Sequence, residues 1–187
     1  MLAVTNNTQL IQETARQIPG TVNYTIQRYS KPATQLVEDM GALHYHYKGK
    51  ASADNFLELR FCLTGNMYCP RPAKDCNHCA VHQVVDCQEK VESIDVLSFV
   101  FSSTLLQQLV KSRNGNDTLA EDVLTFRHTS SFTKVIPLCN RTKAILEGLL
   151  NHNYTDTLEN IYVNAQTQML LLYSLDCMLG EKEINTI

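Results

Sequence analysis

The cysteine-rich segment between residues 69 and 87 holds the side chains best suited to chemistry. Two of its cysteines have two residues between them, the spacing with which a pair of thiolates chelates one zinc ion, whereas the outer two stand singly. A histidine of the segment could replace either outer ligand. The pattern fits a zinc site, a disulfide or redox pair, or free thiols in a hairpin loop. The cysteines are Cys69, Cys76, Cys79 and Cys87, and the histidines are His78 and His82.

The run from His44 to Tyr47 alternates two imidazoles with two phenols. On a β-strand, both histidines point to one face and both tyrosines to the other. Inside a barrel, such a histidine pair would begin a cupin-like metal site. A cupin also needs a glutamate a few residues later, and the next one here, Glu58, comes twelve residues after His46. The alternative is an ordinary half-exposed strand whose histidines are hydrogen-bonded.

The sequence has none of the short motifs that assemble a catalytic site. It contains no phosphate-binding glycine loop, no nucleophile elbow and no His-Glu-x-x-His helix. A zinc ion held by four cysteines would have no open coordination position, so it would hold a loop in place and not catalyse a reaction. We therefore expect that the protein is not an enzyme.

Composition excludes several classes of protein. The chain has 187 residues, of which 44% are hydrophobic, so it can bury a core as one domain or a two-lobed one. A net charge of −3 gives it no basic surface for nucleic acid. The longest apolar run, from Met169 to Tyr173, is far shorter than the ~20 residues that span a bilayer. Without a signal-like N-terminus, and with an odd set of seven cysteines, it is expected to be cytoplasmic with reduced thiols.

The spacing of apolar residues changes near Ser102. Residues 1–20 are expected to be an N-terminal arm that ends at a turn, and residues 21–101 mostly follow a period of two. We predict strands over residues 21–27, 36–38, 42–47, 55–64 and 94–101. The last of these is apolar on both faces, which indicates a strand covered on both sides.

After Ser102 the spacing becomes helical. We predict a helix capped by Ser102-Ser103-Thr104, another from about residue 118, a third that opens at Pro137, and a last one from Asp156 to a stop at Gly180. Asp156 and Glu159 have the spacing of a capping box. The apolar stripe of the last helix is wide enough to pack inside the domain and also to meet a second protomer. The residues expected at that interface are Ile161, Ala165, Met169 and Leu172.

Three segments resemble the N-terminal sensor half of AraC-type transcription regulators, most closely the PchR-like branch. Residues 58–65 look like the family's apolar strand that ends in a glycine before a hairpin. Residues 95–110 are similar to its strand that runs into a serine-capped helix. Residues 154–173 look like the long helix that precedes its DNA-binding module. Together they cover roughly residues 55–178.

The resemblance implies an α+β fold. An antiparallel cupin-like β-barrel or sheet, about residues 21–101, would carry the cysteine-rich insert 69–87. A helical lobe, about residues 103–179, would follow it. The resemblance also implies an effector-sensing domain that binds a small molecule, forms a homodimer through its helices, and binds DNA only through a C-terminal domain missing here. Residues 181–187 would then begin the linker, in a truncated or stand-alone sensor domain. Small-ligand pockets are mostly apolar with a few polar groups, so we expect this one to be lined by His44, Tyr45, His46, Tyr47, Phe56, Leu59 and Phe61.

Two other functions remain open from the sequence. One is a cupin-type metalloenzyme that uses His44 and His46. The other is an interaction module stabilised by zinc at the cysteine cluster.

Overall fold

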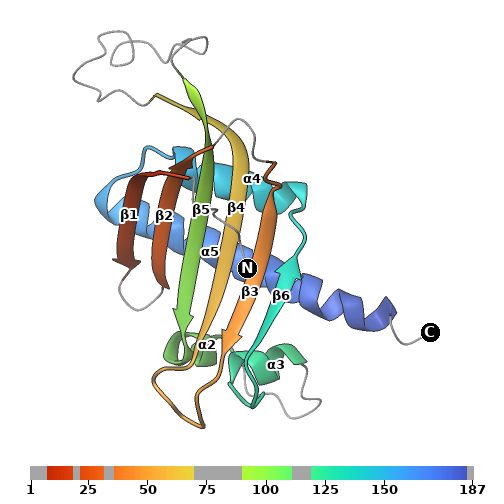
Figure 1. Ribbon diagram of the computed structural model, residues 1–187. Helices are drawn as coiled ribbons and strands as arrows, with labels where there is room; N and C mark the ends of the chain where they lie inside the picture. Colours follow the sequence, from red (N-terminus) through yellow and green to blue (C-terminus); the bar gives the residue numbers. More distant parts are fainter. Residues whose placement is uncertain (1–7, 19–21, 32–35, 70–89, 111–118, 185–187) are drawn as a thin grey trace.

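The computed structural model describes residues 8–18, 22–31, 36–69, 90–110 and 119–184. Within these ranges the chain forms one six-stranded sheet and four helices, an α+β arrangement (Figure 1). The strands are β1 (Leu10–Ile18), β2 (Val22–Ser30), β3 (Met40–His46), β4 (Phe56–Tyr68), β5 (Val91–Ser102) and β6 (Phe132–Ile136). The helices are α2 (Ser103–Leu109), α3 (Leu119–Leu124), α4 (Asn140–Asn151) and α5 (Asp156–Ile184).

The sheet is antiparallel throughout and open. Its strand order is β1-β2-β5-β4-β3-β6, so β1 and β6 are the two edges and do not pair with each other. The predicted antiparallel sheet is confirmed. A closed cupin-like barrel is not, because the described strands leave both edges unjoined.

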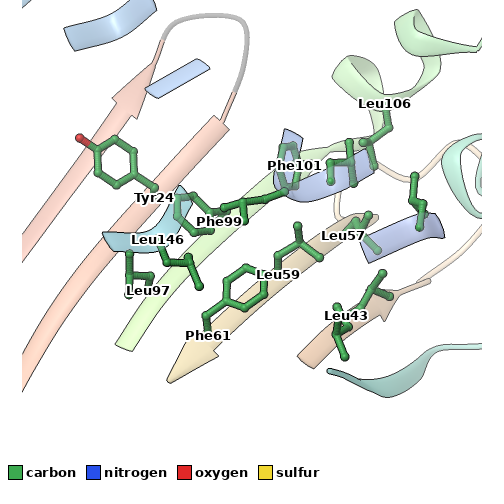
Figure 2. Close-up of a cluster of buried hydrophobic side chains, with 14 of the residues drawn as sticks. Tyr24, Leu43, Leu57, Leu59, Phe61, Leu97, Phe99, Phe101, Leu106 and Leu146 are labelled. Carbon is green, nitrogen blue, oxygen red and sulfur yellow. The ribbon is translucent and has the colours of Figure 1, made fainter. Parts of the chain in front are cut away.

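Helices α4 and α5 cross the same face of the sheet (Figure 1). Every second residue of the central strands points to that face, as strand geometry requires, and packs against the helices. At the contact between α4 and α5, a Cβ added to Gly148 would lie 2.5 Å from the hydroxyl oxygen of Tyr162, so a larger residue there would require the Tyr162 side chain to shift. Figure 2 shows part of this core, including Tyr24, Leu43, Leu57, Leu59, Phe61, Leu97, Phe99, Phe101, Leu106 and Leu146.

Strand β5 is buried on both faces, as its sequence predicted. Leu97 and Phe99 belong to the core under the helices, whereas Ile94 and Val96 form a second cluster with Cys62 on the opposite face. Partly buried residues of β2, β3 and the β2–β3 connection pack on this second cluster; they are Tyr29, Met40 and Val37. The connection between β2 and β3 therefore helps to cover the face that the helices leave open.

Several element boundaries differ from the predictions. The expected N-terminal arm contains strand β1, which pairs antiparallel with β2 and is mostly exposed. Residues 36–38 lie outside any strand, and β4 continues past Gly65, which adopts φ 84° at a bulge, to Tyr68. Strand β6 lies inside the expected helical lobe, where a five-residue edge strand gives little periodic signal.

Some of the predicted helix boundaries are confirmed and others are not. Ser102 caps α2 as expected, because its hydroxyl accepts a hydrogen bond from the Leu105 amide at 3.3 Å. Helix α4 begins at Asn140, three residues after Pro137. The capping box is absent: the Glu159 carboxylate binds Arg16 of β1 instead. Gly180 does not end α5, which continues to Ile184.

None of the described helices has both the length and the apolar character that crossing a bilayer would require. Helix α5 is long enough, but asparagine, glutamine and threonine interrupt its apolar positions.

Candidate functional site

A hollow with a volume of about 560 Å³ lies at the end of the sheet where β3 ends and α2 begins. In Figure 1 this is the end that carries α2, α3 and the β3–β4 connection. The volume falls within the range of small-molecule pockets, about 300–1,000 Å³. Its lining comes from three segments and consists of Tyr47, Lys50, Ala51, Ser52, Ala53, Asn55, Ser103, Thr104, Gln107, Thr125, Phe126, Arg127 and Thr129.

The β3–β4 connection forms one wall and is held in shape by Asn55. This side chain is buried, with 2% of the residue exposed. Its Nδ2 donates to the Gly49 carbonyl at 2.8 Å, and its Oδ1 accepts from the Lys48 amide at 2.8 Å. Between these anchors Ala51 adopts the left-handed backbone, φ 57°. Asn55 thus ties the end of the loop to its beginning. Losing either hydrogen bond would leave a buried polar group unpaired, so the two bonds fix the conformation of the loop.

The segment after α3 forms the opposite wall. Phe126 also has a left-handed backbone, φ 54°, and its ring stacks on Tyr45 with centroids 5.1 Å apart. Tyr45 is buried and donates its hydroxyl to the His128 carbonyl at 2.7 Å. Burial, together with the nearby Tyr47 and Asp122, raises the pKa of Tyr45 to about 12, so this phenol stays a neutral donor at physiological pH. The contact with the buried Tyr45 therefore fixes Phe126, and with it the backbone of Arg127, in the lining of the hollow.

Cationic and hydroxyl side chains dominate the hollow. Lys50 and Arg127 are its charged residues, and no aspartate or glutamate is among the lining residues. The Arg127 Nε donates to the Thr125 hydroxyl at 3.1 Å and lies 3.2 Å from an oxygen of Asp122, which is outside the lining. The hydroxyls belong to Tyr47, Ser52, Ser103, Thr104, Thr125 and Thr129.

A second hollow of about 420 Å³ adjoins the first and shares Ala53, Asn55 and Thr104 with it. Its other polar lining is mainly amide and hydroxyl, from β1, β2, β5 and α2: Gln17, Asn23, Ser102 and Gln108. Its one carboxylate, Asp54, forms an ion pair of 2.5 Å with Lys48. Each hollow thus contains a charged residue that is ion-paired: Arg127 with Asp122 in the first and Asp54 with Lys48 in the second.

A polar network occupies the sheet face opposite the helices. The Ser98 hydroxyl donates to Glu58 at 2.8 Å, and Arg60 donates to Glu58 at 3.0 Å and to Ser98 at 3.1 Å. Beside them, a 2.9 Å hydrogen bond joins His44 Nδ1 to the Thr133 hydroxyl. Burial lowers the pKa of His44, and the Glu58 charge opposes this shift. Each of these groups already has a partner on the sheet.

The structure does not bring the seven predicted pocket residues together. Tyr45, Leu59 and Phe61 are buried in the core, on the helix side of the sheet. His44 and His46 lie on the opposite face, as their alternation predicted, and His46 stacks on Phe56 with ring centroids 4.8 Å apart. Only Tyr47 lines the first hollow, and Phe56 lines the second.

Sequence reasoning missed most residues that line the hollow. Ser103 and Thr104 were recognised, but as cap residues of α2. The segment from Lys50 to Asn55 was not singled out, although its short polar and small residues are typical of a functional loop between two strands.

The predicted zinc ligands are mostly outside the described residues. Cys69 is described and half-buried at the end of β4, whereas Cys76, Cys79 and Cys87 fall in the undescribed range 70–89, together with His78 and His82. Elsewhere, no three His, Cys, Asp or Glu side chains gather as a metal site within the described ranges. For the metalloenzyme alternative, this leaves His44 and His46 without a third ligand in the described part of the chain.

The predicted dimer residues form an exposed stripe on α5. Ile161 is 62% exposed and Leu172 56%, and Ala165 and Met169 are exposed between them. Leu158 extends the stripe by one turn. From Thr157 to Leu175, the only charged residue of α5 is Glu159, which is buried and paired with Arg16. A long, exposed and uncharged apolar face is typical of a protein interface.

Comparison with known proteins gives no relative: no family model matches the chain, and no curated protein or solved structure matches it.

Proposed function

We propose that this chain is the effector-sensing domain of an AraC-type transcription regulator, and that its effector binds in the hollow between the β3–β4 connection, α2 and the α3–β6 connection. The observation that carries the proposal is this hollow of small-molecule size, whose walls are fixed by the buried Asn55 and Tyr45. A preformed polar hollow beside rigid elements favours binding over chemistry, because it holds a ligand without presenting a nucleophile and a base to it.

The resemblance of residues 58–65, 95–110 and 154–173 to the sensor half of these regulators supports the proposal. One of those segments, residues 95–110, reaches the hollow, since β5 runs into α2 at Ser102, and Ser103 and Thr104 line the hollow. In this proposal the six-stranded sheet is the counterpart of the family's cupin-like barrel, and the attached helix-turn-helix modules would read DNA in the major groove.

Self-association through α5 is the second part of the proposal. One side of α5 is buried in the core through Val163, Leu170 and Leu171. The stripe from Ile161 to Leu172 is exposed on the same helix. A second copy of the chain fits this stripe because a two-fold axis at Ala165 would place a small residue against itself, where helix axes can approach to about 8 Å.

The contacts of α3 suggest how the two parts communicate. Helix α3 ends at the hollow, where Thr125, Phe126 and Arg127 line it, and it also contacts α5. A ligand that binds one placement of α3 better than another would shift the population of that placement, and with it the position of α5. The effector would thereby change how two DNA-binding modules are spaced.

A thermal-shift screen tests the binding part of this proposal. A panel of charged and neutral metabolites is scanned for compounds that raise the melting temperature. A ligand present at 100 times its dissociation constant stabilises a protein by about 2.7 kcal/mol, or about 5–10 °C for a domain of this size. Gln107→Trp, which places an indole in the hollow, should abolish the shift. Leu109→Trp on the same helix, outside the lining, should preserve it. A panel without any binder, or a shift unchanged by Gln107→Trp, would count against the proposal.

A further inference from the structure

We infer that the second hollow, of about 420 Å³, is a separate binding site for a neutral ring compound whose edge carries a hydrogen-bond donor beside an acceptor. Such an edge occurs on a nucleobase and on a sugar ring with neighbouring hydroxyls. The inference goes beyond the proposed function, which places the effector in the first hollow. Three features carry it: amide side chains without partners, an apolar surface beside them, and walls held by contacts outside the hollow.

Three side-chain amides of the lining are available to a ligand. They belong to Gln17 of β1, Asn23 of β2 and Gln108 of α2, and within the described part of the chain none of these side chains is hydrogen-bonded. Gln17 and Asn23 are directly paired on neighbouring strands, which places their Cβ atoms about 4.5–5.5 Å apart. An amide presents a donor and an acceptor side by side, so it forms two hydrogen bonds with an edge that presents the same pair, as asparagine and glutamine do with adenine.

An apolar surface adjoins these amides. Phe56, Val100 and Leu105 belong to the same lining, and Val100 on β5 is directly paired with Asn23. The one carboxylate of the lining, Asp54, is ion-paired with Lys48, so the lining offers no unpaired charge to an ion. Apolar side chains with a few polar groups suit a ring that has apolar faces and a polar edge, and the absence of an unpaired charge favours a neutral one.

Contacts outside the hollow hold its walls in place. On β1, Arg16 precedes Gln17 and binds the carboxylate of Glu159, which is buried in the first turn of α5. On α2, the wall begins at the cap residue Ser102, and the β3–β4 connection is fixed by the two hydrogen bonds of Asn55. A ligand that binds between fixed walls loses less free energy to the ordering of the protein.

Isothermal titration with matched neutral compounds tests the inference. In one arm adenosine is compared with purine riboside, which lacks the exocyclic amino donor. In the other arm monosaccharides are compared with deoxy analogues that lack one of two neighbouring hydroxyls. We expect at least one compound to bind at least tenfold more tightly than its analogue, because the analogue leaves an amide group of the site unpaired. The two arms show which source of the edge is preferred, and a difference in either arm supports the inference.

Substitutions of glutamine by methionine connect that binding to the second hollow. Methionine keeps the length of the side chain but has neither the amide donor nor its oxygen acceptor. Gln17→Met and Gln108→Met, both at exposed positions, should each weaken binding at least tenfold. Gln12→Met on β1 makes the same change outside both linings, and Gln107→Met on α2 makes it in the lining of the first hollow only. Both control variants should bind as the unmodified protein does.

The outcomes separate the second site from the proposed function. Binding that Gln107→Met weakens, and that Gln17→Met and Gln108→Met leave unchanged, would place the compound in the first hollow; it would support the sensor proposal and overturn the second site. Equal binding of each compound and its analogue would overturn the role of the amides. If no compound of either arm binds, the second site is wrong, whereas the sensor proposal still depends on the wider panel of the thermal-shift screen.

Discussion

A buried carboxylate holds three strands of the sheet together. Asp95 is fully buried on β5, where its carboxylate accepts from Arg28 at 2.7 Å and from Asn66 at 2.7 Å. Arg28 also lies over the Tyr68 ring, with the guanidinium carbon 5.8 Å from its centroid. These contacts join β2, β4 and β5 near the points where β4 ends and β5 begins. The cost of burying the charge is offset only while each partner stays in place.

Asp39 makes a comparable junction, and its stability contribution should depend on pH. Its carboxylate accepts from the Thr64 amide at 2.8 Å, from the Thr64 hydroxyl at 2.9 Å and from Lys143 of α4 at 2.7 Å. Burial alone would raise the pKa of Asp39, but the hydrogen bonds from Lys143 and Thr64 outweigh it and lower the pKa. A lowered folded-state pKa means that the stabilisation is complete above the unfolded pKa, about 3.9, and is lost as pH falls through the folded value.

We therefore expect Asp39→Asn to destabilise the protein at pH 7 and to cost progressively less below pH ~4. Urea unfolding of both proteins at pH 7 and pH 3 measures the two differences in free energy. Glu38→Gln, which removes a charge from the exposed neighbouring residue, is the control and should have little effect at either pH. An Asp39→Asn difference of the same size at both pH values would show that the ionised carboxylate is not what stabilises this junction.

At the scale of the elements, helix α2 depends on its cap because it is short. It has seven residues, and a helix of this length is not stable in isolation. Ser102 ends β5 and caps α2, so the hollow's wall of Ser103, Thr104 and Gln107 begins at this hydroxyl.

Ser102→Ala should cost about 1 kcal/mol of stability, because the Leu105 amide loses its acceptor. For a chain of this length the melting temperature should fall by about 2–4 °C. Calorimetry of Ser102→Ala and Ser102→Asn measures it, since asparagine caps as well as serine does and should restore most of the loss. If both variants lose the same stability, packing at the end of β5 and not capping is the cause.

The elements that the sequence predicted well are those with long periodic patterns. Strands β2, β4 and β5 and helices α4 and α5 each repeat an apolar spacing that the core then uses. Strands β1 and β6 could not be predicted in the same way. β1 is an edge strand whose exposed residues are mostly polar, and β6 is five residues long. Both gain their stability from a neighbouring strand, which local spacing does not reveal.

The hollow could not be predicted because its walls meet only in the folded chain. Lys50, Gln107 and Arg127 lie in three separate segments, and none carries a motif. Tyr45, Leu59 and Phe61 were expected in a pocket because they are apolar and lie on central strands. They fill the core instead, since an inward face on a sheet backed by two helices is occupied by those helices.

At the scale of the whole molecule, helix α5 has two apolar sides, one buried and one exposed. Its inner side buries Val163 and Leu170 completely against the sheet, while its outer side exposes Ile161 and Leu172. The width of the apolar stripe was visible in the sequence, and the structure divides it between these two sides. The outer side of α5 has no charged residue over about five turns, whereas the exposed face of a helix in a monomer normally carries charged residues.

If the outer side of α5 joins two copies, a charge at its centre should separate them. Ala165→Glu would bring two unpaired carboxylates together in the interface, at a cost of at least about 3 kcal/mol, or about 100-fold in the dimer dissociation constant. Sedimentation equilibrium over a range of protein concentrations measures that constant. Val135→Glu, at a β6 residue that is 62% exposed, adds the same charge elsewhere and should leave the dimer intact. An unmodified protein that stays monomeric at high concentration, or an Ala165→Glu variant that dimerises as tightly, would mean that α5 meets something other than a second copy.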